Sequence, residues 1–520
     1  MDRKDTAILI LVAILIGPLV LTGYTISQQS PGIGGGGGAG GIPDWVNEQG
    51  GGVEACSYLI YREGSITYAK NQQPGTNRGR NQFSDSSANS VFVNVLAQLT
   101  RGTICVKASS SEYQVTSSLT WASNVNLKCE GFGTQITIDA GAIDLISIPD
   151  GATNIFIQDC YMRNFNIAVG SGIITTVGSV TALNVIHNFL VGSNGAIEAQ
   201  SCSDCIIDGN AIQATRTAIS LRSLFRTIIS NNIVQNTNDN CIDIGTVQDV
   251  TVTGNICRDT QGTPTTINGV YVDTVQGALS ITGNEIRNIL RNGIQLNTIT
   301  GPMTAVSISG NTIVLPGQVA GGDAGIYLFG DTTRRVYNVT IAGNFISHPG
   351  RQGILIEFST NIVVSGNILN NAGTISSANG YGIRLDESTE VVITSNRASD
   401  NSQYGIGIFS SSSQILVTGN DVRGNTVGGM SITGGLTGIL VRDNLGFITE
   451  NMGATSVADG GTISHGLVST PTTVQCTTSI TDEFCSVTAL AATTFTVTIT
   501  KHDGTAGTTQ IIYWYAVFIP

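Results

Sequence analysis

Carboxylates, arginines and aromatic rings occupy two fixed positions of a short phrase, small-apolar-x-apolar-x, that recurs along the chain. The first x position reads Glu198, Ser220, Asp243, Tyr271, Gln295, Tyr327, Leu355, Arg384 and Gly407. The second x position reads Gln200, Arg222, Gly245, Asp273, Asn297, Phe329, Glu357, Asp386 and Phe409. Strand alternation points both positions to one face. Because rings stack on the apolar faces of sugars and carboxylates bind hydroxyl groups, we expect carbohydrate to be bound there by Tyr271, Asn297, Tyr327, Phe329 and Arg384.

Two pairs of carboxylates on this face could also do acid–base chemistry. Glu357 and Asp386 stand on neighbouring units about 4.8 Å apart, and Asp243 and Asp273 are diagonal neighbours at roughly 7–8 Å. Glycoside hydrolysis uses carboxyl pairs at about 5–9.5 Å, so these four residues are the candidate catalytic groups. A solvated face with Arg384 balancing Asp386 is the alternative, and either pair could hold Ca²⁺. The sequence indicates no other metal or cofactor.

The repeat that positions these side chains is marked by asparagine. The fullest copies, such as Ile281-Thr282-Gly283-Asn284-Glu285-Ile286, alternate apolar and polar residues and then place Asn beside a small residue. The intervals from Asn to Asn run from 22 to 33 residues. This period predicts a stacked β-solenoid, in which each unit buries its apolar side against its neighbours. The recurring residues are Asn188, Asn210, Asn232, Asn255, Asn284, Asn311, Asn344, Asn367, Asn396, Asn420 and Asn444.

We expect the Asn column to be structural. Gly tolerates the positive φ of a tight corner, Asn is the next best residue there, and amide groups at equivalent corners can bond from coil to coil. Two long intervals predict loops inserted at a corner, over residues 259–267 and 315–324, where specificity would be carried.

The start of the solenoid shows a cap. Residues 85–99 read as a short amphipathic helix with Val91, Val95 and Leu99 on one face and Ser84 or Asp85 as N-cap. Short strand-like segments follow, over residues 102–107, 113–115, 119–121 and 124–131. This order resembles the pectate-lyase-like right-handed parallel β-helix proteins, across roughly residues 56–446.

The resemblance implies an all-β fold, a right-handed single-stranded parallel β-helix. It specifies chemistry weakly, since the superfamily contains lyases, hydrolases, epimerases, viral tailspikes and adhesins. The chain lacks the Asp-Asp, Gly-His-Gly and Arg-x-Lys motifs of the polygalacturonase type.

The two ends of the chain differ from the repeat. Residues 1–26 contain an apolar run after Arg3 and Lys4 and read as a signal peptide or a membrane anchor with the bulk of the chain outside; a prepilin-like start is a further alternative. Residues 27–52 form a Gly-rich linker. We then expect a cap and first coils over 53–128, the β-helix over 129–446, and a small β-sandwich over 447–520. This last part resembles modules that end viral tail fibres and some archaeal surface proteins.

Ten cysteines indicate an oxidising compartment. Candidate disulfides are Cys476–Cys485, Cys241–Cys257 and Cys105–Cys129, and Cys202 and Cys205 form either a disulfide or two core thiols. Asn338 begins the N-glycosylation sequon.

A formal charge of −12 argues against a nucleic-acid partner. We therefore expect an extracellular or cell-surface protein that binds a surface polysaccharide or serves adhesion or structural display. The alternatives are a polysaccharide lyase or glycoside hydrolase, and a self-associating subunit of a surface filament or layer.

Overall fold

The computed structural model describes residues 56–73, 79–139, 141, 143–165, 171–192, 194–213, 216–261, 267–297, 305–318, 324–433 and 436–520. The predicted anchor and linker lie outside these residues, as do the central parts of both predicted corner loops. Among the described residues, no helix has the length and apolar character needed to cross a membrane.

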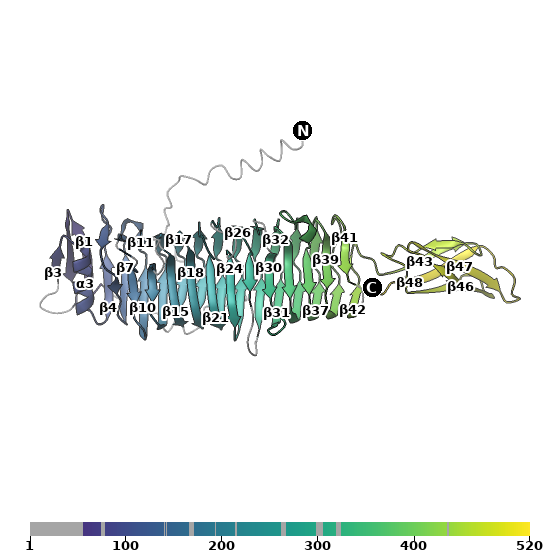
Figure 1. Cartoon of the computed structure of the whole chain (residues 1–520), viewed down its shortest axis with the longest axis horizontal. Helices are drawn as coiled ribbons and strands as arrows, with labels where there is room; N and C mark the ends of the chain where they lie inside the picture. The colour runs from purple at the N-terminus through teal and green to yellow at the C-terminus, as the bar shows by residue number, and fades with distance from the viewer. Residues whose placement is uncertain are drawn as a thin grey trace, which may run out of the picture. The chain divides into compact units, whose positions relative to one another are not determined.

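Three strands make each coil of a parallel β-solenoid with about 13 turns. Strands at equivalent places in successive coils pair in parallel and form three stacks, and Figure 1 shows β15, β18, β21 and β24 side by side. The first stack contains β4 (Gly102–Val106), β7 (Val125–Cys129), β10 (Ala152–Gln158), β13 (Ser179–Ile186), β16 (Ile206–Asp208), β19 (Ile228–Ser230), β22 (Val250–Thr253), β25 (Leu279–Thr282), β28 (Val306–Ser309), β31 (Val336–Ala342), β34 (Ser359–Ser365), β37 (Thr389–Thr394), β40 (Ser413–Thr418) and β42 (Thr437–Arg442). The second contains β5 (Tyr113–Val115), β8 (Gln135–Ile138), β11 (Tyr161–Asn164), β14 (Phe189–Gly192), β17 (Ala211–Gln213), β20 (Ile233–Gln235), β23 (Ile256–Arg258), β26 (Glu285–Ile289), β29 (Thr312–Pro316), β32 (Phe345–Ser347), β35 (Ile368–Asn370) and β38 (Arg397–Ser399). The third contains β6 (Leu119–Thr120), β9 (Ile146–Ile148), β12 (Gly172–Thr176), β15 (Gly195–Ser203), β18 (Thr217–Phe225), β21 (Ile242–Gln248), β24 (Val270–Val275), β27 (Ile294–Leu296), β30 (Ala324–Phe329), β33 (Gln352–Glu357), β36 (Ile383–Asp386), β39 (Tyr404–Phe409) and β41 (Gly428–Ile432).

The third stack confirms the predicted register. Its strand pairs align every first x position, from Glu198 opposite Ser220 to Arg384 opposite Gly407. Apolar residues of the same strands, such as Ile219 and Ile244, are fully buried in the core. The alternation read from the sequence therefore does place the x positions on the outer side of one stack.

The Asn column is a buried hydrogen-bond ladder, as predicted. Asn284 donates from its backbone N and its Nδ2 to Oδ1 of Asn311, at 3.0 and 2.9 Å. The same pair of bonds joins each consecutive pair of column residues from Asn188 to Asn444. Because the side-chain amides of the column bond to neighbouring coils, the column stabilises the stack and is not a ligand-binding site.

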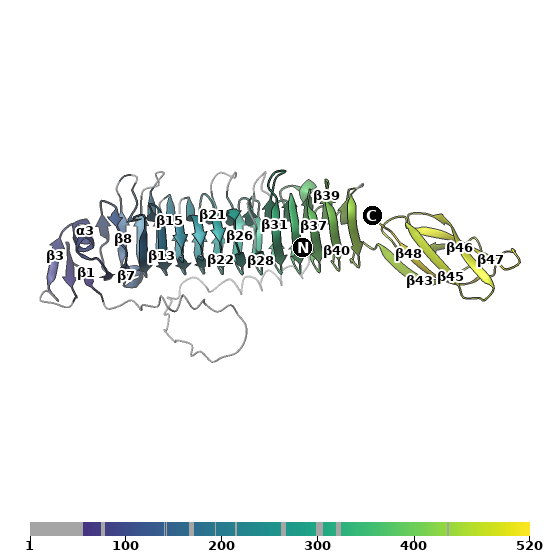
Figure 2. The ribbon, with the colours of Figure 1, turned by 90° about the horizontal axis from the view of Figure 1, so that it is seen from below.

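A hairpin layer and one helix cap the first coils. β1 (Tyr58–Glu63), β2 (Ile66–Asn71) and β3 (Asn81–Asp85) pair antiparallel, and β1 continues the first stack beside β4. Helix α3 spans Ala88–Gln98 and buries Val91 and Val95, and Figure 2 shows it beside β1 and β3.

The predicted N-cap is wrong. Asp85 ends β3, and its Oδ1 accepts a hydrogen bond from the backbone N of Ser87 at 2.8 Å. This turn delays the helix until Ala88, so Ser87 occupies the N-cap position.

Short 3₁₀ turns occur at Gly131–Gly133 (η1) and Ser377–Asn379 (η2).

The last part of the chain is the predicted β-sandwich. One sheet contains β43 (Glu450–Val457), β48 (Gln510–Val517) and β45 (Thr473–Thr478), and the other contains β44 (Thr462–Ser464), β47 (Thr494–Lys501) and β46 (Glu483–Leu490). Phe495, Val497, Ile512 and Trp514 fill the core between them.

Four disulfides are present: Cys56–Cys105, Cys129–Cys160, Cys202–Cys205 and Cys476–Cys485. The predicted Cys105–Cys129 pair is wrong. Register sets Cys105 opposite Lys128 and Val106 opposite Cys129, so the two cysteines project to opposite sides of neighbouring strands.

The predicted Cys241–Cys257 pair is also wrong. Both residues are buried thiols, and Cys257 Sγ donates to the carbonyl of Gly269 at 3.6 Å. Burial holds the pKa of the Cys257 thiol well above its usual value.

Candidate functional site

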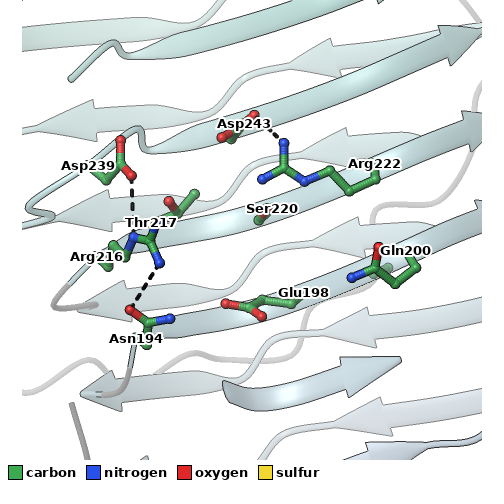
Figure 3. Close-up of a pocket in the computed structure, with 10 residues that line it drawn as sticks. Asn194, Glu198, Gln200, Arg216, Thr217, Ser220, Arg222, Asp239 and Asp243 are labelled. Carbon is green, nitrogen blue, oxygen red and sulfur yellow. Dashed lines mark hydrogen bonds and ion pairs between the residues drawn. The ribbon is translucent and has the colours of Figure 1, made fainter. Parts of the chain in front are cut away.

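A pocket opens on the outer side of the third stack, over β15, β18 and β21 (Figure 3). Its volume is ≈ 290 Å³. Register aligns Glu198 with Ser220 and Ser220 with Asp243, so the two carboxylates flank the serine at equivalent places of three successive coils. We call this region the pocket; its lining is Asn194, Glu198, Ala199, Gln200, Arg216, Thr217, Ser220, Arg222, Asp239 and Asp243.

Glu198 lies over a glycine. A Cβ at Gly195 would meet Glu198 Oε1 at 1.9 Å, so the carboxylate occupies space that only glycine leaves. Burial raises the pKa of Glu198, the nearby carboxylate of Asp144 raises it further, and Arg216 and Arg222 oppose the shift. Glu198 is thus a half-buried carboxyl group that packs over the backbone of Gly195.

Asp243 is more deeply buried, with 9% of its surface exposed. Asn240 Nδ2 donates to its Oδ2 at 3.4 Å, while its buried Oδ1 has no hydrogen-bond partner among the described residues. The nearest cation is Arg222, whose Nη1 lies 3.7 Å from that oxygen. Burial raises the pKa of Asp243, with Arg222 and Asn240 opposing the shift. Asp243 therefore lines the pocket with a carboxylate that has one buried oxygen without a hydrogen bond among the described residues.

Three residues, Asn194, Arg216 and Asp239, reach the pocket from the corner before the strands. Arg216 Nε lies 3.6 Å from Asp239 Oδ2, and its Nη1 donates to Asn194 Oδ1 at 3.4 Å. Figure 3 shows Arg216 between these two partners. Both contacts are long and the Arg216 side chain is 53% exposed, so most of its donors are available to a ligand.

The next two coils carry Asp273, the partner of Asp243 in the predicted catalytic pair, together with Tyr271 and Asn297. Tyr271 is directly opposite Asp243, and Asp273 is exposed two residues further along β24. Asn297 donates to Tyr271 Oη at 3.0 Å, and its own buried Oδ1 has no hydrogen-bond partner among the described residues. Burial raises the pKa of Tyr271, and Asp273 adds to that shift. These residues extend the polar surface beyond the pocket.

The Glu357–Asp386 pair belongs to a different environment. Register sets Phe329, Glu357, Asp386 and Phe409 in one row over β30, β33, β36 and β39. Arg384 Nε donates to Asp386 Oδ2 at 2.7 Å, and Tyr327 Oη donates to Glu357. Both predicted catalytic carboxyl groups are therefore engaged by neighbouring side chains.

The aromatic residues of this second region pack on one another. Tyr381 stacks on Tyr404 at 6.0 Å and meets the edge of Phe409 at 5.5 Å, while the Arg384 guanidinium lies over Phe409 at 5.0 Å. Tyr327 is only 8% exposed. We call this region the aromatic platform, and it contains Tyr327, Phe329, Glu357, Tyr381, Arg384, Asp386 and Phe409.

The sequence identified the row that contains the pocket but not the pocket itself. Glu198 and Arg222 appear among the x positions without a role, and Arg216 and Asp239 lie outside the phrase. The sequence did contain a signal for the corner residues. Asn194, Arg216 and Asp239 each precede the first x position of their coil by the same number of residues. Aligning successive copies would therefore have shown that they stack in a column. Asn338 lies in β31, where its Oδ1 accepts from Asn361 Nδ2 at 2.6 Å, and its glycosylation stays a prediction.

Residues 268–445 match the family model described as a right handed beta helix region. The fold is a right-handed parallel β-helix of the pectate-lyase-like type. Residues 153–338 match the model described as periplasmic copper-binding protein (NosD). No curated protein sequence matches the chain.

Solved structures that are similar to this chain are distant in sequence. A mutant tailspike protein of E. coli bacteriophage HK620 is 11% identical, with a TM-score of 0.50 over 86% of this β-helix chain and 91% of that chain. The Azotobacter vinelandii mannuronan C-5 epimerase AlgE4 A-module is 13% identical, with a TM-score of 0.41 over 68% and 95%. The Streptococcus pneumoniae surface adhesin PfbA is 14% identical, with a TM-score of 0.41 over 68% and 90%.

The described residues do not fit the copper named in the second family model. They contain no group of three or more His, Cys, Asp or Glu residues arranged to hold a metal ion. Of the cysteines in residues 153–338, Cys160, Cys202 and Cys205 are in disulfides. Calcium binding at the carboxylate pairs stays a prediction.

Proposed function

We propose that this protein is an exported, surface-displayed polysaccharide-binding protein and that the pocket is its principal sugar subsite. The proposal rests on the kinds of side chain that line the pocket. Apart from Ala199, every lining residue has a side chain that donates or accepts hydrogen bonds, and both charge signs are represented. Sugars present neighbouring donors and acceptors on each ring, so a pocket of this composition complements them better than it complements an apolar ligand.

The open groups in the pocket support the same proposal. Among the residues that the structure describes, Asp243 Oδ1 is a buried acceptor without a hydrogen bond, and an unsatisfied buried acceptor costs about 1–3 kcal/mol. A sugar hydroxyl can satisfy it. Arg216 and Arg222 are each more than half exposed, with side-chain exposures of 53% and 55%, and can donate to ring or hydroxyl oxygens.

Export is supported by the four disulfides, two of which lock the first coils together. Disulfides persist outside the reducing cytosol. Anchoring through residues 1–26 remains a prediction on a part of the chain that the structure does not describe.

A glycan array with the full chain tests the binding function. Arg216→Ala should weaken retention of the bound glycan by roughly tenfold, the effect of losing about 1.4 kcal/mol. Arg287→Ala is the matched control, because Arg287 is equally exposed at 52% but pairs with Glu285 on the second stack. Equal losses for the two variants, or no bound glycan, would contradict the proposed pocket.

Self-association or adhesion through the C-terminal sandwich is a second candidate function. Ile511, Tyr513 and Tyr515 alternate outward on the central strand β48, with exposures of 44%, 52% and 37%. Exposed apolar rows of this kind mark interaction surfaces. Light scattering of the purified chain and of a Tyr513→Ser, Tyr515→Ser variant tests it; a monomer at every concentration would contradict self-association.

A further inference from the structure

The geometry points to cleavage as well as binding: we propose that Glu198 and Asp243 hydrolyse a glycosidic bond of the polysaccharide held in the pocket, with Glu198 as general acid and Asp243 as general base. This inference rests on the proposed binding function and assigns the reacting groups of the same pocket.

The spacing of the two carboxylates suits a reaction in which water attacks directly. Both side chains align with Ser220, one coil on either side, so their Cα atoms are about 9.6 Å apart at about 4.8 Å per coil. Inverting glycosidases keep their carboxyl groups roughly 6.5–9.5 Å apart to leave room for the sugar and a water molecule, and a Cα separation of about 9.6 Å lies at the upper limit of that range. Adjacent-coil pairs such as Glu357 and Asp386, at about 4.8 Å, leave no such room.

The surroundings of the two groups assign their roles. Glu198 lies near the carboxylate of Asp144, and its burial and this neighbour both favour the protonated form that an acid needs. Burial raises the pKa of Asp243 as well, but Arg222 at 3.7 Å and Asn240 at 3.4 Å oppose that shift and so favour the carboxylate form that a base needs. Its Oδ1 has no hydrogen-bond partner among the described residues, so the Asp243 carboxylate has bonding capacity left for the proton that the water loses.

The step balances with water as the only co-reactant. Glu198 transfers its proton to the glycosidic oxygen as the bond from that oxygen to the anomeric carbon breaks. The water oxygen bonds to the anomeric carbon from the opposite face, and Asp243 takes the proton that the water loses. Glu198 ends ionised and Asp243 protonated, and exchange with solvent restores both. The product sugar has inverted anomeric configuration.

The experiment uses the full chain and a fixed panel of probes: laminarin, xylan, polygalacturonate, alginate and hyaluronan. Retention on each immobilised polymer and release of new reducing ends are measured in parallel. For the retained polymer, Glu198→Gln and Asp243→Asn should each lower product release by at least roughly 100-fold, as expected on losing a general acid or base, with retention changed less than threefold. Proton NMR of the first product should show the inverted anomer.

Matched controls separate chemistry from folding. Glu285→Gln and Asp249→Asn make the same substitutions outside the pocket, on the second stack and at an exposed corner, and should release product at the wild-type rate.

Retention of a polymer by the wild-type chain without release of reducing ends would overturn cleavage and leave binding intact. Retention of no polymer would overturn both. An unsaturated product, a retained anomer, or wild-type release by both variants would each overturn the assignment of hydrolysis to this pair.

Discussion

The pocket and the aromatic platform lie on the same stack, in the same register, and use the same kinds of side chain, yet they differ in what those side chains contact. In the platform, Asp386 is bonded to Arg384 at 2.7 Å and the rings cover one another. In the pocket, the two arginine–carboxylate distances are 3.6 and 3.7 Å, and one buried carboxylate oxygen has no hydrogen bond to any described residue. A repeat face therefore becomes a candidate site where its polar groups leave bonding capacity open, and becomes structural where they satisfy one another.

The largest expected difference concerns the two arginines. Arg384→Ala should destabilise the fold by about 2 kcal/mol, because it leaves the partly buried Asp386 without its cation. Arg222→Ala should cost less than about 0.5 kcal/mol, because its contact is long and its side chain is exposed. Urea unfolding of the two variants measures both values. A loss for Arg222→Ala as large as that for Arg384→Ala would remove the distinction between the regions.

A pair of glycine substitutions should separate stability from binding. A Cβ at Gly407 would lie 2.5 Å from Phe409 and 2.9 Å from Tyr381, so Gly407→Ala should destabilise the platform by about 1–2 kcal/mol through overpacking. At Gly195 the added Cβ would meet Oε1, Cδ and Cγ of Glu198, which belong to one flexible side chain that can rotate away. Gly195→Ala should therefore change stability by less than about 0.5 kcal/mol while lowering glycan affinity roughly tenfold. Thermal unfolding and the retention assay check the two effects; unchanged retention with Gly195→Ala would contradict the expected displacement of the Glu198 side chain into the pocket.

The smallest expected effect is a pH-dependent rise in the Tm of a Glu198→Gln variant. The folded pKa of Glu198 lies above its unfolded value near 4.5, so the folded state binds more protons and stability falls as pH rises through that interval. Asp144 adds to this shift, and Arg216 and Arg222 reduce it. Glu198→Gln should raise Tm by about 1–2 °C at pH 7, and the gain should vanish below the unfolded pKa. Calorimetry at pH 4 and pH 7 measures the difference, and a gain of equal size at both pH values would exclude ionisation as its cause.

Much of the fold could be predicted because its signals are local and repeated. Alternation placed Ile281 inward and Thr282 outward, and the Asn284–Asn311 pair recurs coil after coil, so each copy supports the register of the next. The candidate site was harder to predict. Arg216 and Asp239 precede the repeated phrase and join the pocket only through stacking. The predicted N-cap was wrong because Asp85 accepts a hydrogen bond from Ser87 in a turn before the helix. The predicted Cys105–Cys129 disulfide was wrong because the two cysteines are offset by one residue in the strand register.

By itself, the sequence determined the coil, its register and the row of side chains that faces outward, because these depend on residue alternation and corner residues within each repeat. Only the tertiary structure decided which members of that row have partners. That depends on distances between side chains of different coils: Arg384 reaches Asp386 at 2.7 Å, Arg222 stays 3.7 Å from Asp243, and Glu198 fits only because Gly195 has no Cβ.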